Sequence, residues 1–258
     1  MKIHYLDSYF MEATHPITIG LIGCGGTGSN LLTQLGRINF SLQALGHPGL
    51  EVTVFDGDQV SEANPGRQLF STNEIGLNKA NALVTRINRF YGTQWTSVPQ
   101  YYSADLPNGL KGHNLIVTCV DSASSRKEIY SIIKSHSCDT QPYSIYYWLD
   151  TGNTRDGGQI IFGSLREIKQ PEKSKFDCVG KLPHLLDRYP NIEDYDNEAD
   201  QGPSCSVAQA LAAQDLFVNS IIAQFTGDII WKALKDGFVI HNGLFVNLTS
   251  RKTNPLKL

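Results

Sequence analysis

The stretch Ile17–Ile22, ITIGLI, followed by Gly23-Cys24-Gly25-Gly26-Thr27-Gly28, decides the fold class of this chain. The first six residues are apolar and rich in β-branched side chains, which predicts a buried strand. Leucine and isoleucine residues at helical spacing follow the glycines and predict an amphipathic helix. A Gly-x-Gly-x-x-Gly turn between a strand and a helix presents backbone N–H groups and the positive end of a helix dipole to phosphate groups. The stretch therefore predicts a nucleotide-binding α/β fold.

The segments around this stretch continue the alternation of strands and helices. Strands are expected at 51–55, 97–102, 115–120, 144–150 and 158–164. Helices are expected from a capping box at Ser71–Glu74 to about Phe90, over 124–136, and from about Ser206 to Leu234. Residues 238–248 predict a hairpin that turns at Asn242-Gly243. This order predicts a Rossmann-like fold, with a mainly parallel mixed sheet, helices on both faces and a C-terminal antiparallel hairpin.

The 258 residues are expected to form one domain, because no linker or internal repeat divides the sequence. Within it, residues 17–164 are the predicted nucleotide-binding core. Residues 165–203 show little periodicity and predict a long crossover loop, a type of segment that is often functional. Residues 204–258 supply the C-terminal helix and hairpin.

Composition excludes several classes of protein. The 22 Lys and Arg residues are balanced by 25 Asp and Glu residues, which argues against binding to nucleic acid or to a membrane surface through bulk positive charge. No run of 18 apolar residues and no signal-peptide pattern is present. Five irregularly spaced cysteines predict free thiols in a reducing compartment. We therefore expect a cytoplasmic protein with neither a nucleic-acid nor a membrane partner.

Charged side chains beyond the predicted strands indicate which nucleotide is bound. Asp56 ends the second strand, where a carboxylate can accept from a ribose hydroxyl. Arg67 and Lys79 follow, and two permanent cations suit a triphosphate under attack better than the bridged pyrophosphate of a dinucleotide. Asp121 ends another strand and can hold Mg²⁺ through phosphate oxygens. Taken singly, the two cations could be solvated loop charges and Asp121 could be a helix cap.

Several spaced motifs after the glycine-rich turn identify a family. They are Asp56-x-Asp58-x-Val60-x-x-x-Asn64-x-x-Arg67-Gln68, Gly76-x-x-Lys79-Ala80, Val120-Asp121 with Arg126, and Asp150-Thr-Gly-Asn. Together with the turn, over at least residues 17–164, they resemble the E1-like adenylating superfamily of ThiF, MoeB, HesA and the ubiquitin-activating enzymes. The segments around Leu182-Pro-His and Pro203-Ser-Cys205-Ser are most similar to the ThiF-type protein of bacterial PRTRC cassettes.

The resemblance implies ATP-dependent adenylation of the C-terminal carboxylate of a small ubiquitin-like or sulfur-carrier protein, with acyl-AMP and pyrophosphate as products. It implies ATP and Mg²⁺ as cofactors and a homodimer as the assembly. Asp121 is expected to bind Mg²⁺ and to act with Arg67 and Lys79 in catalysis. The implied nucleotide-binding residues are Gly23, Gly25, Gly26, Gly28, Asp56, Asp58, Asn64, Arg67, Gln68 and Lys79.

The sequence also departs from the family pattern. It lacks the two C-x-x-C pairs of zinc-binding members, so no structural zinc is expected, and residues 1–16 hold no arginine that could act in trans. Cys205 is the candidate nucleophile for a second, thioester-forming step, because it directly precedes a predicted helix N-terminus. The alternative is a small packed residue. Cys178 is a weaker candidate, and Cys24 and Cys119 fit packing positions better.

Two other function classes remain alternatives. The first is an NAD(P)-dependent oxidoreductase, against which the second cation argues. The second is a non-catalytic nucleotide-binding partner subunit, which would bind nucleotide without turning it over.

Overall fold

A computed structural model describes residues 1–107, 111–135, 144–192 and 214–258. Its centre is an eight-stranded sheet with the order β11-β10-β7-β6-β5-β2-β3-β4. The strands from β4 to β6 run parallel, and β7, β10 and β11 are antiparallel to their neighbours. The strands are β2 (Ile17–Ile22), β3 (Leu50–Phe55), β4 (Thr96–Val98), β5 (Leu115–Thr118), β6 (Tyr147–Asn153), β7 (Gly157–Ser164), β10 (His241–Asn247) and β11 (Lys252–Lys257).

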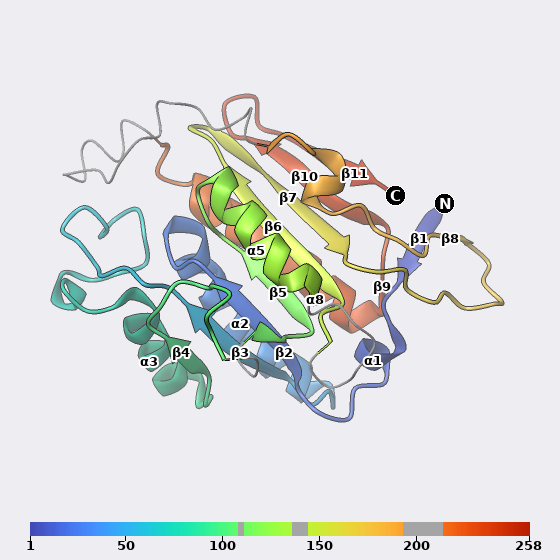
Figure 1. Cartoon of the computed structure of the whole chain (residues 1–258), viewed down its shortest axis with the longest axis horizontal. Helices are drawn as coiled ribbons and strands as arrows, with labels where there is room; N and C mark the ends of the chain where they lie inside the picture. The colour runs from blue at the N-terminus through green and yellow to red at the C-terminus, as the bar shows by residue number, and fades with distance from the viewer. Residues whose placement is uncertain (108–110, 136–143, 193–213) are drawn as a thin grey trace.

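Helices cover both faces of this sheet (Figure 1). The helices α2 (Gly26–Ala44), α3 (Lys79–Tyr91) and α8 (Val218–Asp236) pack on one face, and α5 (Ala123–Ser135) and α6 (Leu185–Arg188) pack on the other. This arrangement confirms the predicted Rossmann-like α/β fold. None of the described helices combines the length and the apolar character that crossing a membrane requires.

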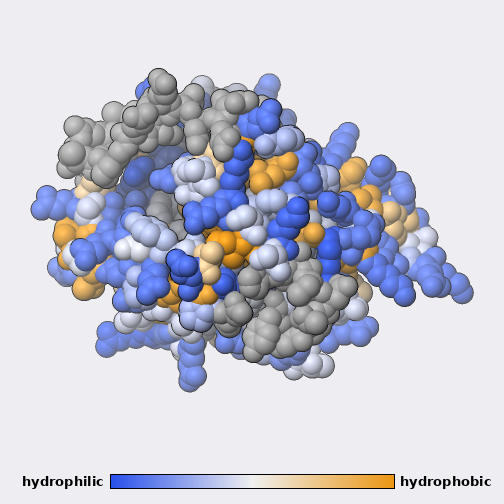
Figure 2. Space-filling view, viewed as in Figure 1, coloured by the Kyte–Doolittle hydropathy of each residue, from blue (hydrophilic) through white to orange (hydrophobic). Residues whose placement is uncertain are grey.

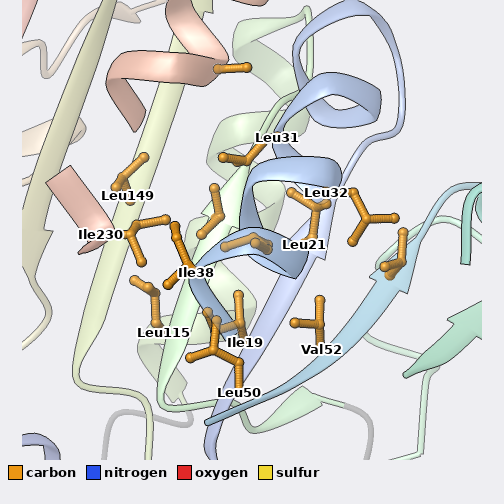
Figure 3. Close-up of a cluster of buried hydrophobic side chains, with 14 of the residues drawn as sticks. Ile19, Leu21, Leu31, Leu32, Ile38, Leu50, Val52, Leu115, Leu149 and Ile230 are labelled. Atoms are coloured by element: carbon orange, nitrogen blue, oxygen red, sulfur yellow. The ribbon is translucent and has the colours of Figure 1, made fainter. Parts of the chain in front are cut away.

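The core is built around β2, whose side chains alternate between two apolar clusters. Ile19 and Leu21 point toward α2 and α8, as Figure 3 shows, while Ile22 faces the cluster beneath α5. A central parallel strand is buried on both faces, which is why its sequence is almost continuously apolar. Leu31 and Leu32 of α2 are also fully buried. Each such leucine contributes about 1.5–3 kcal/mol of hydrophobic stabilisation.

The C-terminal hairpin is present, but its predicted turn at Asn242-Gly243 is wrong. Both residues lie inside β10, and the chain reverses between β10 and β11, around residues 248–251. A Cβ at Gly243 would lie 2.0 Å from the carbonyl oxygen of Ile160 on β7. The glycine is therefore needed for the close approach of two strands, and the Asn-Gly pair does not form a hairpin loop here.

One predicted helix start is also wrong, and a second predicted helix is interrupted. The capping box at Ser71–Glu74 is formed, but it closes only the short 3₁₀ turn η1 (Thr72–Glu74), and α3 begins at Lys79 behind the N-cap Asn78. Gly76, with φ of 88°, ends the first turn before it can extend. Helix α8 begins at Val218, and residues 214–217 before it form a turn, so the predicted helix is not continuous. Residues 206–213, with the predicted start at Ser206, lie outside the described residues.

The structure also contains a small second sheet with the order β8-β1-β9, which the sequence patterns do not indicate. Its strands are β1 (Lys2–Tyr5), β8 (Asp177–Cys178) and β9 (Phe238–Val239), and the helix α1 (Ser8–Met11) follows β1. Strand β8 and helix α6 show that the predicted crossover, 165–203, has local structure in its described part. The predicted strand 97–102 is shorter than expected, since β4 ends at Val98.

His4 on β1 is buried in a chain of hydrogen bonds. Its Nδ1 donates to the carbonyl oxygen of Val179 at 2.6 Å, so Nε2 is left to accept from the Tyr147 hydroxyl at 3.1 Å. That hydroxyl accepts in turn from the Asp7 backbone N–H at 3.0 Å. Burial lowers the pKa of His4 to about 4, although the bond to Val179 acts in the opposite direction.

Acidification is therefore expected to destabilise the protein through His4. Between pH 6.5 and about 4 the unfolded chain binds a proton that folded His4 excludes, so the free energy of unfolding falls as the pH falls through this window. Urea unfolding at pH 7 and at pH 5 measures how far the free energy of unfolding falls between the two pH values. This drop should be about 1–2 kcal/mol smaller in His4→Phe than in the wild type. The exposed control His15→Phe should retain the wild-type drop; an equal drop in all three proteins contradicts the assignment.

Candidate nucleotide-binding site

Asp56 joins the glycine-rich turn to the end of β3. Its carboxylate accepts from the Cys24 backbone N–H at 2.6 Å and from the Asp58 backbone N–H at 2.8 Å. The side chain is almost completely buried, and this burial raises the pKa of Asp56 even though both hydrogen bonds favour the charged form. Asp56 therefore fixes where the turn after β2 lies relative to the turn after β3.

The glycines of the turn are required for different reasons. Gly23 has φ of 92°, and a Cβ on Gly28 would lie 1.9 Å from the Gly23 carbonyl oxygen, so the turn closes on its own backbone. Gly25 is the N-cap residue of α2 and has no side chain to cap the helix. Apart from its two chain neighbours, none of the described residues places an atom within 4 Å of the position that a Cβ on Gly25 would take. The N-terminus of α2 is thus open to an anion.

Lys79 and Asp58 form an ion pair beside this turn. Lys79 is the first residue of α3, is only 7% exposed, and its Nζ lies 2.9 Å from Asp58 Oδ2. The Tyr101 hydroxyl donates to the other oxygen of the same carboxylate. Burial acts to raise the pKa of Asp58, but the bonds from Lys79 and Tyr101 outweigh it and the pKa is lowered. The burial of Lys79 rules out the alternative of a solvated loop charge.

Arg67 and Gln68 carry buried polar atoms that are not satisfied within the described parts of the chain. These atoms are Arg67 Nε and Gln68 Oε1. Within the described residues, the Arg67 side chain forms one hydrogen bond, from its Nη1 to Gln214 Oε1 at 3.4 Å. Leaving a buried polar group unpaired costs about 1–3 kcal/mol. Ser29 Oγ on α2 accepts from the Leu69 N–H at 3.0 Å and so holds this loop against the helix. The unpaired atoms indicate that a polar ligand completes the site.

Asn64 and Asp121 complete the set of predicted site residues. Asn64 is buried, and its Oδ1 accepts from the Ser61 N–H at 2.9 Å, so it shapes the loop that carries Arg67. Asp121 is exposed just beyond β5. The hydrogen bond and charge of Asp58 raise the pKa of Tyr101 to about 12, with smaller contributions from Asp56 and Asp121. Because β3 and β5 are parallel strands of one sheet, Asp56 and Asp121, which follow them, lie at the same edge of that sheet. Figure 2 shows the molecule hollowed on the side of residues 56–78, with hydrophilic side chains in the hollow.

A buried ion pair holds the turn that carries Asp121. Arg126 Nε lies 3.1 and 3.2 Å from the two carboxylate oxygens of Asp150, and Nη2 donates to the carbonyl oxygens of Val120 at 2.6 Å and Thr151 at 3.1 Å. Both side chains are at least nine-tenths buried. Because Val120 directly precedes Asp121, Arg126 sets the position of this carboxylate.

Replacing Arg126 with methionine is expected to lower the free energy of unfolding by about 3–5 kcal/mol, because it leaves the Asp150 charge buried without a partner. Urea unfolding measures this loss. The double variant Arg126→Met/Asp150→Asn should recover at least half of it. The control Lys232→Met breaks an exposed pair, Lys232 with Asp228 at 2.9 Å, and should cost at most about 1 kcal/mol. Equal losses in Arg126→Met and Lys232→Met would contradict the argument.

The cysteines fall into two groups. Burial raises the pKa of Cys24 well above its usual range and that of Cys119 to about 12, so both thiols stay protonated, as the packing interpretation expects. Cys178 lies on β8, with Sγ 3.6 Å from the Phe176 carbonyl oxygen. Cys205 lies outside the described residues. Within the described ranges, no group of three or more His, Cys, Asp or Glu side chains is arranged to hold a metal ion.

Sequence reasoning missed three amides that surround the glycine-rich turn. Asn219 on α8 accepts from Thr27 and Asn153, and it donates to Gln214, the residue that contacts Arg67. No motif spacing links residue 219 to residue 26, because the contact arises only when α8 packs across α2. The Asp150-Thr-Gly-Asn motif does contain Asn153, but its spacing does not reveal this partner.

The glycine turn, the carboxylates and the cations thus meet at the carboxyl ends of a Rossmann-like sheet, which defines a nucleotide-binding protein of the E1-like class. The ThiF family model matches residues 4–254, and the chain belongs to the ThiF family. The family prediction from the motifs is therefore confirmed.

Curated relatives include the ubiquitin-like modifier-activating enzyme 5 of Branchiostoma floridae, which is 24% identical over 195 residues, 70% of this chain and 43% of that protein. The same enzyme of Culex quinquefasciatus is 23% identical over 64% of this chain and 40% of its own length. This chain therefore spans about two-fifths of the length of these relatives.

Solved structures share the fold. The selenomethionine structure of PaaA matches with a TM-score of 0.61 and 16% identity over 97% of this chain and 66% of PaaA. A structure of E. coli MccB matches with a TM-score of 0.60 and 13% identity over 97% of this chain and 64% of MccB. At these identities, the likeness concerns the fold alone.

Proposed function

We propose that this protein uses ATP to adenylate the C-terminal carboxylate of a small ubiquitin-like or sulfur-carrier protein, forming acyl-AMP and pyrophosphate. The observation that carries the proposal is the pair of unpaired buried atoms on Arg67 and Gln68 beside the open N-terminus of α2. The family and the ubiquitin-like modifier-activating enzyme relatives support it. Structures of E. coli MccB were determined with ATP and with AMPCPP together with MccA.

The proposed reaction is one displacement at phosphorus. A carboxylate oxygen of the partner's C-terminus attacks the α-phosphorus of ATP, a new P–O bond forms, and the bond to the β-phosphate oxygen breaks. The electron pair leaves with pyrophosphate. Because the attacking carboxylate is already ionised at neutral pH, no proton has to be removed from it. The protein therefore needs to position the two reactants and to stabilise negative charge.

The site residues have different proposed roles in this reaction. The N–H groups at the start of α2 and the guanidinium of Arg67 are the proposed phosphate contacts, together with Lys79, whose bond to Asp58 holds the ammonium group in place. Asp56 is the proposed ribose acceptor, since each carboxylate oxygen can accept more than the single bond it has here. Asp121 would hold Mg²⁺, which would neutralise charge on the phosphate oxygens.

The observed cations speak against the first of the two alternatives. An NAD(P)-dependent oxidoreductase binds a pyrophosphate that does not need both Arg67 and Lys79. A non-catalytic nucleotide-binding subunit would use the same cations, so turnover is what distinguishes it from an enzyme. Binding of NADH without binding of ATP would favour the first alternative. Binding of ATP without any turnover, in the presence of its partner, would favour the second.

Finer parts of the proposal rest on the sequence. The PRTRC-type relationship, the homodimer, the Mg²⁺ ion and a thioester step at Cys205 draw on the family resemblance. The single adenylation domain and the cytoplasmic location draw on composition and on the lack of a linker. A reducible thioester that Cys205→Ser abolishes would support the last of these, and its absence would leave an enzyme that only adenylates.

ATP–pyrophosphate exchange tests the function directly. The purified protein, ATP, Mg²⁺ and labelled pyrophosphate are mixed with a candidate ubiquitin-like protein that ends in Gly-Gly. Label should enter ATP only when the partner is present, and a partner that lacks its last two residues should give no exchange. Failure of ATP to bind at all would overturn the proposal.

A further inference from the structure

Asn219, the second residue of α8, lies directly over the glycine-rich turn. Its side chain is 2% exposed, and its Oδ1 accepts from Thr27 Oγ1 at 3.2 Å and from Asn153 Nδ2 at 2.6 Å. A Cβ on Gly26 would lie 2.3 Å from Asn219 Nδ2. The amide therefore fills the space that the missing side chain of Gly26 leaves, and it ties α8 to the start of α2 and to the end of β6.

Gln214 continues this network to Arg67. Its Oε1 accepts from Asn219 Nδ2 at 2.8 Å and from Arg67 Nη1 at 3.4 Å, while its Nε2 donates to the Thr154 carbonyl oxygen at 3.2 Å. A chain of two amides thus connects the glycine-rich turn to the guanidinium on the facing loop. These are two of the three groups to which the proposed function assigns phosphate binding.

Both connecting side chains are neutral. Within the described ranges Arg67 forms no ion pair, and its long 3.4 Å bond to an uncharged amide leaves its positive charge uncompensated. A carboxylate at position 214 could form a charge-assisted, bidentate pair with the guanidinium, which is far stronger than the bond to an amide. Such a pair would neutralise the cation and would add a negative charge close to the glycine-rich turn.

We propose that Gln214 and Asn219 are positioning residues that hold Arg67 toward the glycine-rich turn while leaving its charge free for the phosphates of ATP. This inference rests on the proposed function. It assigns the two amides a role that a carboxylate of the same size cannot fill, because a carboxylate satisfies the arginine and repels the triphosphate.

ATP affinity and thermal stability separate this role from a merely structural one. Calorimetric titration with ATP and Mg²⁺ needs no protein partner. Gln214→Glu is expected to raise the Kd for ATP at least about 10-fold. Its carboxylate cannot donate to the Thr154 carbonyl oxygen, but the charged pair with Arg67 offsets this loss, so its Tm should exceed that of Gln214→Met. Gln214→Met has a similar size and no added charge, and it should raise the Kd only about 3-fold. Gln34→Glu is the matched control, since Gln34 Oε1 also accepts from an arginine, Arg37, at 3.1 Å, but in the middle of α2; its Kd should equal that of the wild type.

A double-mutant comparison tests whether Gln214 acts through Arg67. Gln214→Met should have no further effect on ATP affinity in the Arg67→Ala background, because the group that it positions is then absent. Equal Kd values for the wild type and Gln214→Glu would overturn the inference while leaving ATP binding, and with it the proposed function, intact. A Tm loss of equal size in Gln214→Glu and Gln214→Met, with parallel losses of affinity, would also overturn it. A wild-type protein that does not bind ATP would overturn both.

Discussion

Arg67→Ala should lower the rate of partner-dependent ATP–pyrophosphate exchange by about 10²-fold or more, because it removes a donor aimed at developing phosphate charge. The protein should remain folded, since the guanidinium contributes only a 3.4 Å hydrogen bond to Gln214 and has a buried Nε without a partner in the described residues. Exchange rates and Tm, measured on the same preparation, check both statements.

Two further variants sharpen this test. Arg89→Ala removes an exposed arginine from the last turn of α3 and should leave exchange at the wild-type rate. Arg67→Lys keeps the charge but loses the planar fork of donors, so it should fall between the wild type and Arg67→Ala. If exchange in Arg67→Ala stays within about threefold of that in Arg89→Ala, Arg67 has no part in the reaction.

The second large effect is expected in the glycine-rich turn, where alanine at Gly28 should lower stability and alanine at Gly25 should lower ATP affinity. Gly28→Ala places a methyl group 1.9 Å from the Gly23 carbonyl oxygen, so the turn must open, and the free energy of unfolding should fall by about 3 kcal/mol. The added methyl group of Gly25→Ala lies more than 4 Å from the atoms of the described residues other than its chain neighbours, and the free energy of unfolding should change by no more than about 1 kcal/mol. This methyl group nevertheless enters the open space at the start of α2, and the Kd for ATP should rise at least about 10-fold.

The comparison of these two variants distinguishes folding from binding. Urea unfolding measures the first and calorimetric titration with ATP measures the second. Gly25→Ala with wild-type affinity would show that the nucleotide does not approach this end of α2. A fully stable Gly28→Ala would show that the turn has another conformation.

The sequence predicts those parts of the molecule that local patterns determine. The β2 strand, the glycine-rich turn and the apolar face of α2 follow from residues that are neighbours in the chain, and Asp56 is found because it directly follows β3. The Asn242-Gly243 pair shows where such reasoning fails. A dipeptide that fits a tight turn is equally suited to a close approach of strands, and only the packing of β10 against β7 decides between the two.

The connections between distant segments could not be predicted. Asn219 meets Gly26, and Gln214 meets Arg67, across separations of 193 and 147 residues along the chain. Neither amide is distinctive in the sequence, since asparagine and glutamine occur in many environments. The same holds for β1, a four-residue strand whose partners become apparent only from its register with β8 and β9.

The position of β1 affects the order in which the two sheets form during folding. Lys2 pairs with Asp177, and His4 pairs with Val239, so both partners of β1 lie more than 170 residues further along the chain. Contacts this far apart in sequence form late, because a long loop must close before they give any stabilisation. We therefore expect the small sheet to form after the eight-stranded sheet, whose parallel strands pair over shorter separations along the chain.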